Sequence, residues 1–148
     1  MINKKEVLNH FLVVLFNQIL NIEEKALKKG PFKVLTLSEL HVIEAIGEEN
    51  PLPMSAVASR LDVTVGTLTI AINSLVKKGY VNRERSIEDK RVVLISLTPL
   101  GVEANHHHAR FHEEMIAYTV NILEEGEMDV LIKSLSKITT YFETKYDK

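Results

Sequence analysis

The stretch from Thr64 to Lys78 carries side chains that suit hydrogen bonding to flat polar edges and to phosphate. Thr64 is a predicted N-cap, and the helix that follows covers residues 65–78. On a helical wheel the apolar arc, which we expect to face the core, holds Val65, Leu68, Ile72, Leu75 and Val76. The opposite arc has no carboxylate and holds Gly66, Thr67, Ile70, Asn73, Ser74 and Lys77. This mixture of hydrogen-bonding groups, a cation and an apolar group predicts a surface that reads DNA bases, with an ordinary solvated face as the alternative.

A second group of cations follows at a predicted hairpin. After Gly79 the apolar period changes to two, and residues 81–85 and 92–97 have the pattern of paired strands. The cations of this hairpin are Arg83, Arg85, Lys90 and Arg91. A loop of this size fits a minor groove, where the negative potential favours arginine. We expect Asp89 to hold the Arg91 guanidinium by a charge-assisted hydrogen bond, and an ordinary polar hairpin tip is the alternative.

Helix signals place these two groups side by side. A capping box over residues 36–39 (Thr-Leu-Ser-Glu) begins a helix that runs to about residue 48. A turn over residues 50–53 leads to a short helix over 54–60 and a tight connection over 62–64. Two helices joined so closely cross steeply, as in a helix-turn-helix. With the hairpin after it, this order predicts a winged helix-turn-helix.

Long helices with apolar stripes flank this lobe. The first covers about residues 4–28 and ends at Gly30-Pro31. Thr98-Pro99 opens another, which runs to about residue 125, and a last helix covers 128–146. Because their apolar surface exceeds what one small domain covers, we expect packing against a partner chain. The fold class is therefore mainly α with a small β-hairpin wing.

Composition excludes several classes of protein. The chain has 148 residues, a net charge of −2 and no cysteine, which excludes disulfides, Cys-ligated zinc and Cys nucleophiles. Residues 53–91 hold seven basic and four acidic residues, so this stretch is +3 and the remainder −5. A basic middle in an acidic frame favours a polyanion-facing surface. We expect a cytoplasmic protein without a membrane partner, because signal-peptide and membrane-span patterns are lacking.

At these residues the chain resembles the MarR family of bacterial repressors. The matching strings are Asp62-Val63-Thr64-x-Gly66-Thr67-x-Thr69, Asn73-x-Leu75-x-x-Lys78-Gly79-Tyr80, Arg83-x-Arg85-Ser86-x-x-Asp89-x-Arg91-Val92-Val93 and Leu97-Thr98-x-x-Gly101. The resemblance implies one MarR-like domain over residues 1–148, with dimerisation helices at 1–30 and 99–148 and a winged helix-turn-helix lobe at 36–98. It also implies a homodimer on a pseudo-palindromic operator. The predicted DNA-binding residues are Ser55, Thr64, Gly66, Thr67, Thr69, Ile70, Asn73, Ser74, Lys77, Arg83, Arg85, Asp89, Lys90 and Arg91.

Within the family, the chain is similar to the fatty-acid-synthesis repressors of low-GC Gram-positive bacteria. The shared stretches are Ile22-Glu23-Glu24, Phe32-Lys33, Leu40-His41-x-Ile43, Val63 to Thr69 and Arg110-Phe111-His112. This resemblance implies an effector rather than a required cofactor: a long acyl chain on acyl carrier protein, which strengthens DNA binding.

The histidines indicate an alternative to the acyl-responsive repressor. His108 and His112 are four residues apart on one helical face, a spacing that two imidazoles use on a single metal ion. His41 and either Glu23 or Glu24 would complete four ligands, and the candidate set is Glu24, His41, His108 and His112. The same residue types resemble the zinc-responsive repressors of the family. Histidines in a polar interface layer or on solvent are the other interpretation.

Motifs of enzymes are lacking. The six glycines are scattered, so neither a dinucleotide-binding nor a phosphate-binding loop is present, and there is no Gly-x-Ser-x-Gly. We therefore expect no enzyme. The remaining alternative to a DNA-binding repressor is a winged-helix module that binds another protein.

Overall fold

A computed structural model describes residues 3–146; residues 1–2 and 147–148, the outermost ends of the predicted domain, lie outside the described residues. Its elements in chain order are α1 (Lys4–Lys29), α2 (Leu37–Ile46), β1 (Leu52–Pro53), α3 (Met54–Arg60), α4 (Val65–Lys78), β2 (Val81–Arg85), β3 (Val93–Leu97), α5 (Pro99–Ile122) and α6 (Glu127–Tyr146). The chain divides into two compact units, one ending at Ala109 and the other beginning at Arg110. The boundary falls within α5, and each unit is described by itself.

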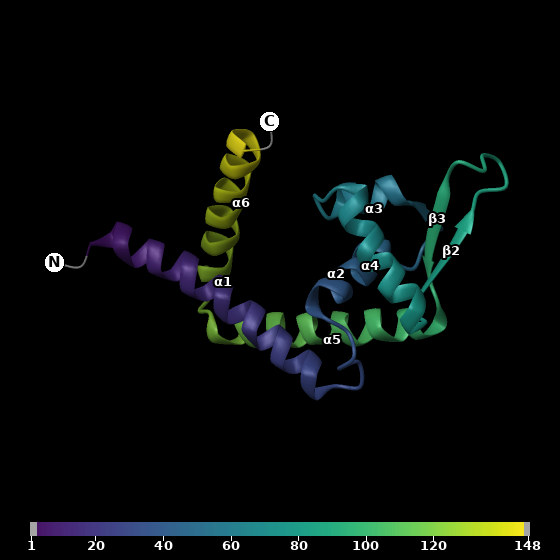
Figure 1. Cartoon of the computed structure of the whole chain (residues 1–148). Helices are drawn as coiled ribbons and strands as arrows, with labels where there is room; N and C mark the ends of the chain where they lie inside the picture. The colour runs from purple at the N-terminus through teal and green to yellow at the C-terminus, as the bar shows by residue number, and fades with distance from the viewer. Residues whose placement is uncertain (1–2, 147–148) are drawn as a thin grey trace. The chain divides into compact units, whose positions relative to one another are not determined.

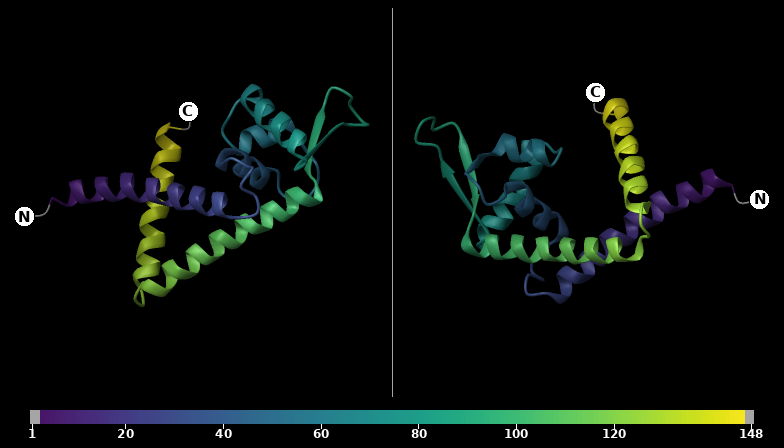
Figure 2. Two further views of the ribbon diagram at one scale, coloured as in Figure 1. Left: turned by 60° about the horizontal axis from the view of Figure 1, so that its bottom comes forward. Right: turned by 180° about the vertical axis from the view of Figure 1, so that it is seen from behind.

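The first unit holds the winged helix-turn-helix. Figures 1 and 2 show α2, α3 and α4 gathered beside the β2–β3 hairpin, whose tip extends away from the helices. The core is made of side chains from α2, α3, α4 and the sheet, among which Ile43, Val57, Ile72, Leu75 and Ile95 are each 0% exposed. The fold class is confirmed: the unit is mainly helical, with an antiparallel wing.

The wing is a sheet of three strands rather than a hairpin alone. The strand order is β1-β3-β2, and both pairings are antiparallel. The sequence predicts a turn over residues 50–53, but Leu52 and Pro53 pair with Ile95 and Leu94. This pairing is a long-range contact with β3, and a two-residue strand ending in proline has no local pattern that would announce it.

Caps fix the helix ends where the sequence predicts them. Thr36 and Glu39 form a reciprocal capping box, and the Thr64 hydroxyl accepts a hydrogen bond from the Thr67 N–H. Gly79 ends α4 in the left-handed conformation at φ 84°. Two predicted ends were too long: α2 ends at Ile46 rather than about residue 48, and α5 at Ile122 rather than about residue 125.

A threonine and a glycine join the wing to α5. Thr98 donates its backbone N–H to the Tyr80 carbonyl at 3.0 Å and its hydroxyl to the Gly79 carbonyl at 2.6 Å. The Gly101 N–H in turn donates to the Thr98 hydroxyl at 3.1 Å. A Cβ at Gly101 would lie 2.2 Å from the Tyr80 carbonyl oxygen, so only glycine fits this approach. The Leu-Thr-x-x-Gly string of the sequence therefore has a packing role.

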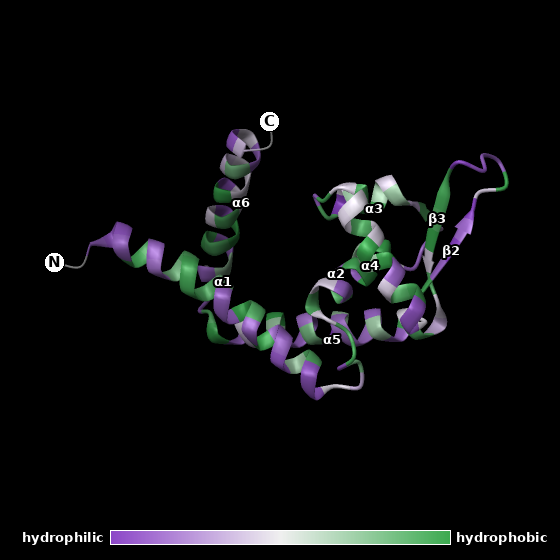
Figure 3. Ribbon diagram, in the orientation of Figure 1, coloured by the Kyte–Doolittle hydropathy of each residue, from purple (hydrophilic) through white to green (hydrophobic). Residues whose placement is uncertain are grey.

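Apolar side chains remain exposed on α1 in the first unit and on α6 in the second. Figure 3 shows hydrophobic positions recurring along both helices. Phe11 and Phe16 of α1 are 59% and 63% exposed, and α6 has no buried residue among those described. Among residues 3–146, no single helix combines the length and apolarity needed to cross a membrane.

Candidate nucleic-acid interface

The connection between α3 and α4 sets the angle of the predicted recognition helix. The two helices meet at a bend of 105°. Asp62 takes a positive φ of 52°, and the Val63 N–H donates to the Ala58 carbonyl, so the chain reverses within three residues. Aspartate tolerates this left-handed conformation better than a β-branched residue does. The buried side of α4 is then held against the core by Leu68, which is 1% exposed.

Most of the predicted contact residues on α4 lie on its exposed side. Gly66, Thr67, Asn73 and Lys77 are exposed, and Ile70 is 75% exposed. Thr64 and Ser55, at the N-terminal ends of α4 and α3, are exposed as well. The helix itself contains no acidic residue. The structure therefore brings these predicted residues to one accessible surface, and their contact with DNA stays a prediction.

One residue of the predicted apolar arc lies outside the core. Val65 is 45% exposed, whereas the wheel places it with the buried side chains. Val65 is the first residue of α4, and its side chain lines a cavity between the helices and the wing. A wheel treats all positions of a helix alike, but the first turn extends beyond the core that the later turns cover.

Thr69 and Ser74 direct their hydroxyl protons into the lobe. Thr69 Oγ1 donates to the Val65 carbonyl at 2.7 Å. Ser74 Oγ donates to the Glu39 carboxylate at 2.6 Å and is only partly exposed. Each bond uses the single proton of its hydroxyl, and the lone pairs of the oxygen can still accept hydrogen bonds.

The Glu39 carboxylate joins α2 to α4 through hydrogen bonds. Its carboxylate also accepts from the Thr36 N–H at 2.9 Å and from the Lys78 ammonium at 2.7 Å, and the residue is 6% exposed. Burial by itself raises the pKa of Glu39, but the hydrogen bonds from Lys78, Ser74 and Thr36 outweigh it and hold the pKa below its ordinary value. The capping box identifies Glu39 from sequence, whereas its contact with Lys78, 39 residues away, has no sequence signal.

The predicted cations of the wing are exposed residues. Arg83 and Arg85 lie on β2, and Lys90 and Arg91 lie in the loop between β2 and β3. All four are exposed. The Asp89 carboxylate accepts from the Arg91 backbone N–H at 3.0 Å, where the sequence predicts the guanidinium as donor. The guanidinium is therefore not the donor in this contact, and the carboxylate instead closes a local turn with the backbone two residues on, as aspartate side chains commonly do.

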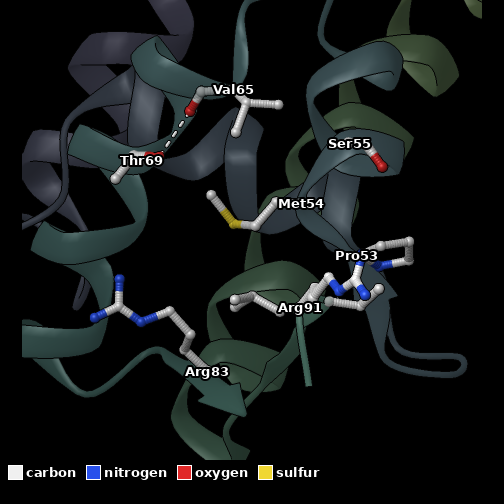
Figure 4. A pocket seen from close by; sticks show the side chains of 9 residues that line it. Pro53, Met54, Ser55, Val65, Thr69, Arg83 and Arg91 are labelled. Carbon is white, nitrogen blue, oxygen red and sulfur yellow. Dashed lines mark hydrogen bonds between the residues drawn. The ribbon is translucent and has the colours of Figure 1, made fainter. Parts of the chain in front are cut away.

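A cavity of about 460 Å³ lies between α3, the start of α4 and the wing. In Figure 4, Met54 extends toward Val65 and Thr69, while Arg83 and Arg91 approach from the wing. Ser55 lines the same cavity. The sequence analysis predicts Ser55 of this short helix as a contact residue but not Met54, because an apolar side chain carries no signal of its own for DNA binding.

Asn73 and Arg83 are brought together from two elements. The Arg83 Nη1 donates to the Asn73 Oδ1 at 2.6 Å, which links α4 to β2. Both side chains are exposed. Two residues that the sequence predicts as separate DNA contacts therefore already contact one another.

The structure brings some of the predicted metal ligands together and separates others. Glu23 of α1, rather than Glu24, meets His41 and His108: Glu23 Oε1 lies 3.2 Å from the Nε2 of each. Glu24 instead pairs with Lys28 on the surface at 2.8 Å. Glu23 and His108 are 4% and 3% exposed. His112 belongs to the second unit, and its part in a ligand set stays a prediction.

Comparisons with known proteins agree with this geometry. A family model described as the MarR family matches residues 35–93. The crystal structure of Streptococcus pneumoniae FabT in complex with DNA is 35% identical, with a TM-score of 0.91, over 95% of this chain and 99% of that chain. The HTH-type transcriptional regulator SarZ of Staphylococcus haemolyticus is 31% identical over 70% of this chain and 69% of SarZ. The HTH-type regulator YhjH of Bacillus subtilis is 26% identical over 57% of this chain, which spans about half (49%) of YhjH.

Proposed function

Because the chain belongs to the MarR family of winged helix-turn-helix transcriptional regulators, we propose that it is a repressor that binds a pseudo-palindromic operator as a homodimer. The family is one of DNA-binding regulators and not of enzymes, as the sequence predicts. The observation that carries the proposal is the exposed side of α4, free of carboxylates and flanked by a wing with exposed arginines. This pairing suits a major groove and an adjacent minor groove.

The exposed apolar side chains of α1 and of α6 favour a homodimer. Aromatic side chains of α1 are more than half exposed, and α6 exposes Tyr141 and Phe142 at 52% and 48%. Soluble proteins rarely leave such faces uncovered, and a second copy supplies a self-complementary partner. A dimer with two recognition helices also accounts for the symmetry of the proposed operator.

The regulated pathway in this proposal is fatty-acid synthesis, with acyl-acyl carrier protein as the effector that strengthens DNA binding. Similarity to FabT over nearly the whole chain and the short strings shared with that branch support it. Acylated carrier protein is therefore expected to lower the operator dissociation constant. Unacylated carrier protein is the matched control, and equal affinity with both would exclude this effector.

Salt dependence tests the DNA-binding core of the proposal. Fluorescence anisotropy of a labelled duplex measures the binding constant. Its logarithm should fall steeply and linearly with the logarithm of the salt concentration, because Lys and Arg side chains that bind the phosphates release the counterions of the DNA. Sedimentation of the protein alone should show a dimer. A module that binds another protein would show no such dependence, and a monomer at assay concentration would contradict the dimer.

A zinc-responsive repressor is the second candidate, and the cluster of Glu23, His41 and His108 favours it. The three ligand atoms all lie within 4.8 Å of one another. For zinc–ligand distances of about 2.0–2.1 Å, tetrahedral geometry separates neighbouring ligand atoms by about 3.3 Å. The two 3.2 Å separations between Glu23 and the histidines are close to this spacing.

Zinc titration separates the two candidates. Competition with a chromophoric chelator should show one tight site per chain, lost in His41→Ala and retained in His10→Ala, which removes an exposed histidine outside the cluster. Operator affinity measured with and without zinc then shows whether the site regulates. Equal chelator competition by the wild type and His41→Ala would exclude the cluster as the site.

A further inference from the structure

The contact between Asn73 and Arg83 has a fixed chemical polarity. Arginine has donors and no acceptor, so the amide group must turn its oxygen toward the guanidinium, as it does at 2.6 Å. The backbone that carries each exposed side chain is fixed by the core: Asn73 follows Ile72, Arg83 pairs with Ile95, and these two isoleucines are each 0% exposed. The amide is therefore held in one orientation before DNA arrives.

That orientation changes which base the asparagine suits. An unengaged asparagine pairs with adenine in two ways at once, because Oδ1 accepts from the adenine N6 and Nδ2 donates to N7. In this chain the Arg83 guanidinium occupies one of the two lone pairs of Oδ1 and places its positive charge there, while both Nδ2 donors of the amide remain to be used. We propose that Arg83 is a positioning residue that makes Asn73 a donor, so that Asn73 reads guanine through N7 and O6. The inference rests on the proposed function and names a specificity determinant within it.

Neighbouring groups on α4 have the same polarity. Thr64 Oγ1 donates to Thr67 Oγ1 at 3.0 Å, so the Thr67 hydroxyl keeps its own proton for an outside acceptor. Lys77 is exposed and carries only donors. No carboxylate on the helix offsets them. Since guanine presents two adjacent acceptors in the major groove, this donor-rich face is matched to it.

Selection from a randomised duplex library, followed by sequencing, tests the inference. The wild type, Asn73→Ala, Arg83→Met and Arg85→Met are compared at equal fractions of DNA bound. Asn73→Ala locates the position that Asn73 reads. Arg83→Met keeps the length of the side chain and removes its donors. Arg85→Met is the matched control, because Arg85 is an exposed cation of the same strand whose guanidinium makes no hydrogen bond within residues 3–146.

The expected result is a switch of one base in each half-site. The wild type selects guanine at the position that Asn73→Ala relaxes, and Arg83→Met selects adenine there, with a change in relative preference on the order of tenfold. Arg85→Met retains guanine and weakens binding to all sequences alike. Wild-type base preference in Arg83→Met, or no relaxed position in Asn73→Ala, would overturn the inference. Failure of the wild type to enrich any sequence would instead overturn the proposed function itself.

Discussion

Replacing Gly101 with alanine should destabilise the protein, although the same change usually stabilises a helix. Gly101 lies in the first turn of α5, and an added Cβ would lie 2.2 Å from the Tyr80 carbonyl oxygen and 3.2 Å from the Leu97 Cβ. Ordinary contact begins at 3.4 Å, so the methyl group and Tyr80 must separate by 1.2 Å. Tyr80 is 4% exposed, and its carbonyl also accepts from the Thr98 N–H.

The magnitude follows from two opposing terms. Alanine gains about 0.5–1 kcal/mol over glycine in a helix interior. Overpacking of a well-packed site costs about 1–3 kcal/mol, and a weakened hydrogen bond to Tyr80 costs about 1 kcal/mol more. We therefore expect Gly101→Ala to lower the free energy of unfolding by about 2 kcal/mol.

Urea unfolding at one fixed chain concentration measures this difference, because the stability of a dimer depends on concentration. Gly66→Ala is the matched control: the nearest atom to its added Cβ is 3.8 Å away, so the helical gain should appear without the clash. The two variants should shift the midpoint in opposite directions. A midpoint raised in both would show that Gly101 does not approach the Tyr80 carbonyl closely.

Three further predictions concern the lobe. Glu39→Gln should lower the free energy of unfolding near neutral pH. Because the folded pKa of Glu39 is below its ordinary value, this loss should shrink as the pH falls through that lowered pKa. A loss of the same size at every pH in urea titrations would contradict the role of the charge. Asp62→Val should cost about 1–2 kcal/mol in thermal melts, since Asp62 has a φ of 52°, and Asp62→Asn should cost little. Arg91→Ala should weaken operator binding by about 1–3 kcal/mol in anisotropy titrations and leave the sedimenting dimer intact; unchanged affinity would remove Arg91 from the interface.

Much of the site follows from local sequence rules. The Thr64 cap, the α3 and α4 boundaries and the left-handed Gly79 are each set by neighbouring residues, so they are predictable without a fold. The wheel also identifies most of the exposed side of α4 correctly. Its error at Val65 comes from the edge of the core, whose extent the sequence does not define.

Sequence alone was less informative where a side chain chooses between partners. Adjacent glutamates on α1 have the same type and nearly the same position, yet Glu23 enters the histidine cluster and Glu24 pairs with Lys28. The choice depends on the rotation of α1 about its axis. That rotation is fixed by packing of residues such as Leu27, which is 5% exposed.

The sequence by itself determined the order of the elements, their caps and the carboxylate-free helix, because these depend on residues within a few positions of one another. Tertiary structure alone decided the pairing of β1 with β3, the contact of Asn73 with Arg83 and the burial of Glu39 against Lys78. Each joins residues at least 10 positions apart, and the orientation of the packed elements selects the partner from several of the same chemical type.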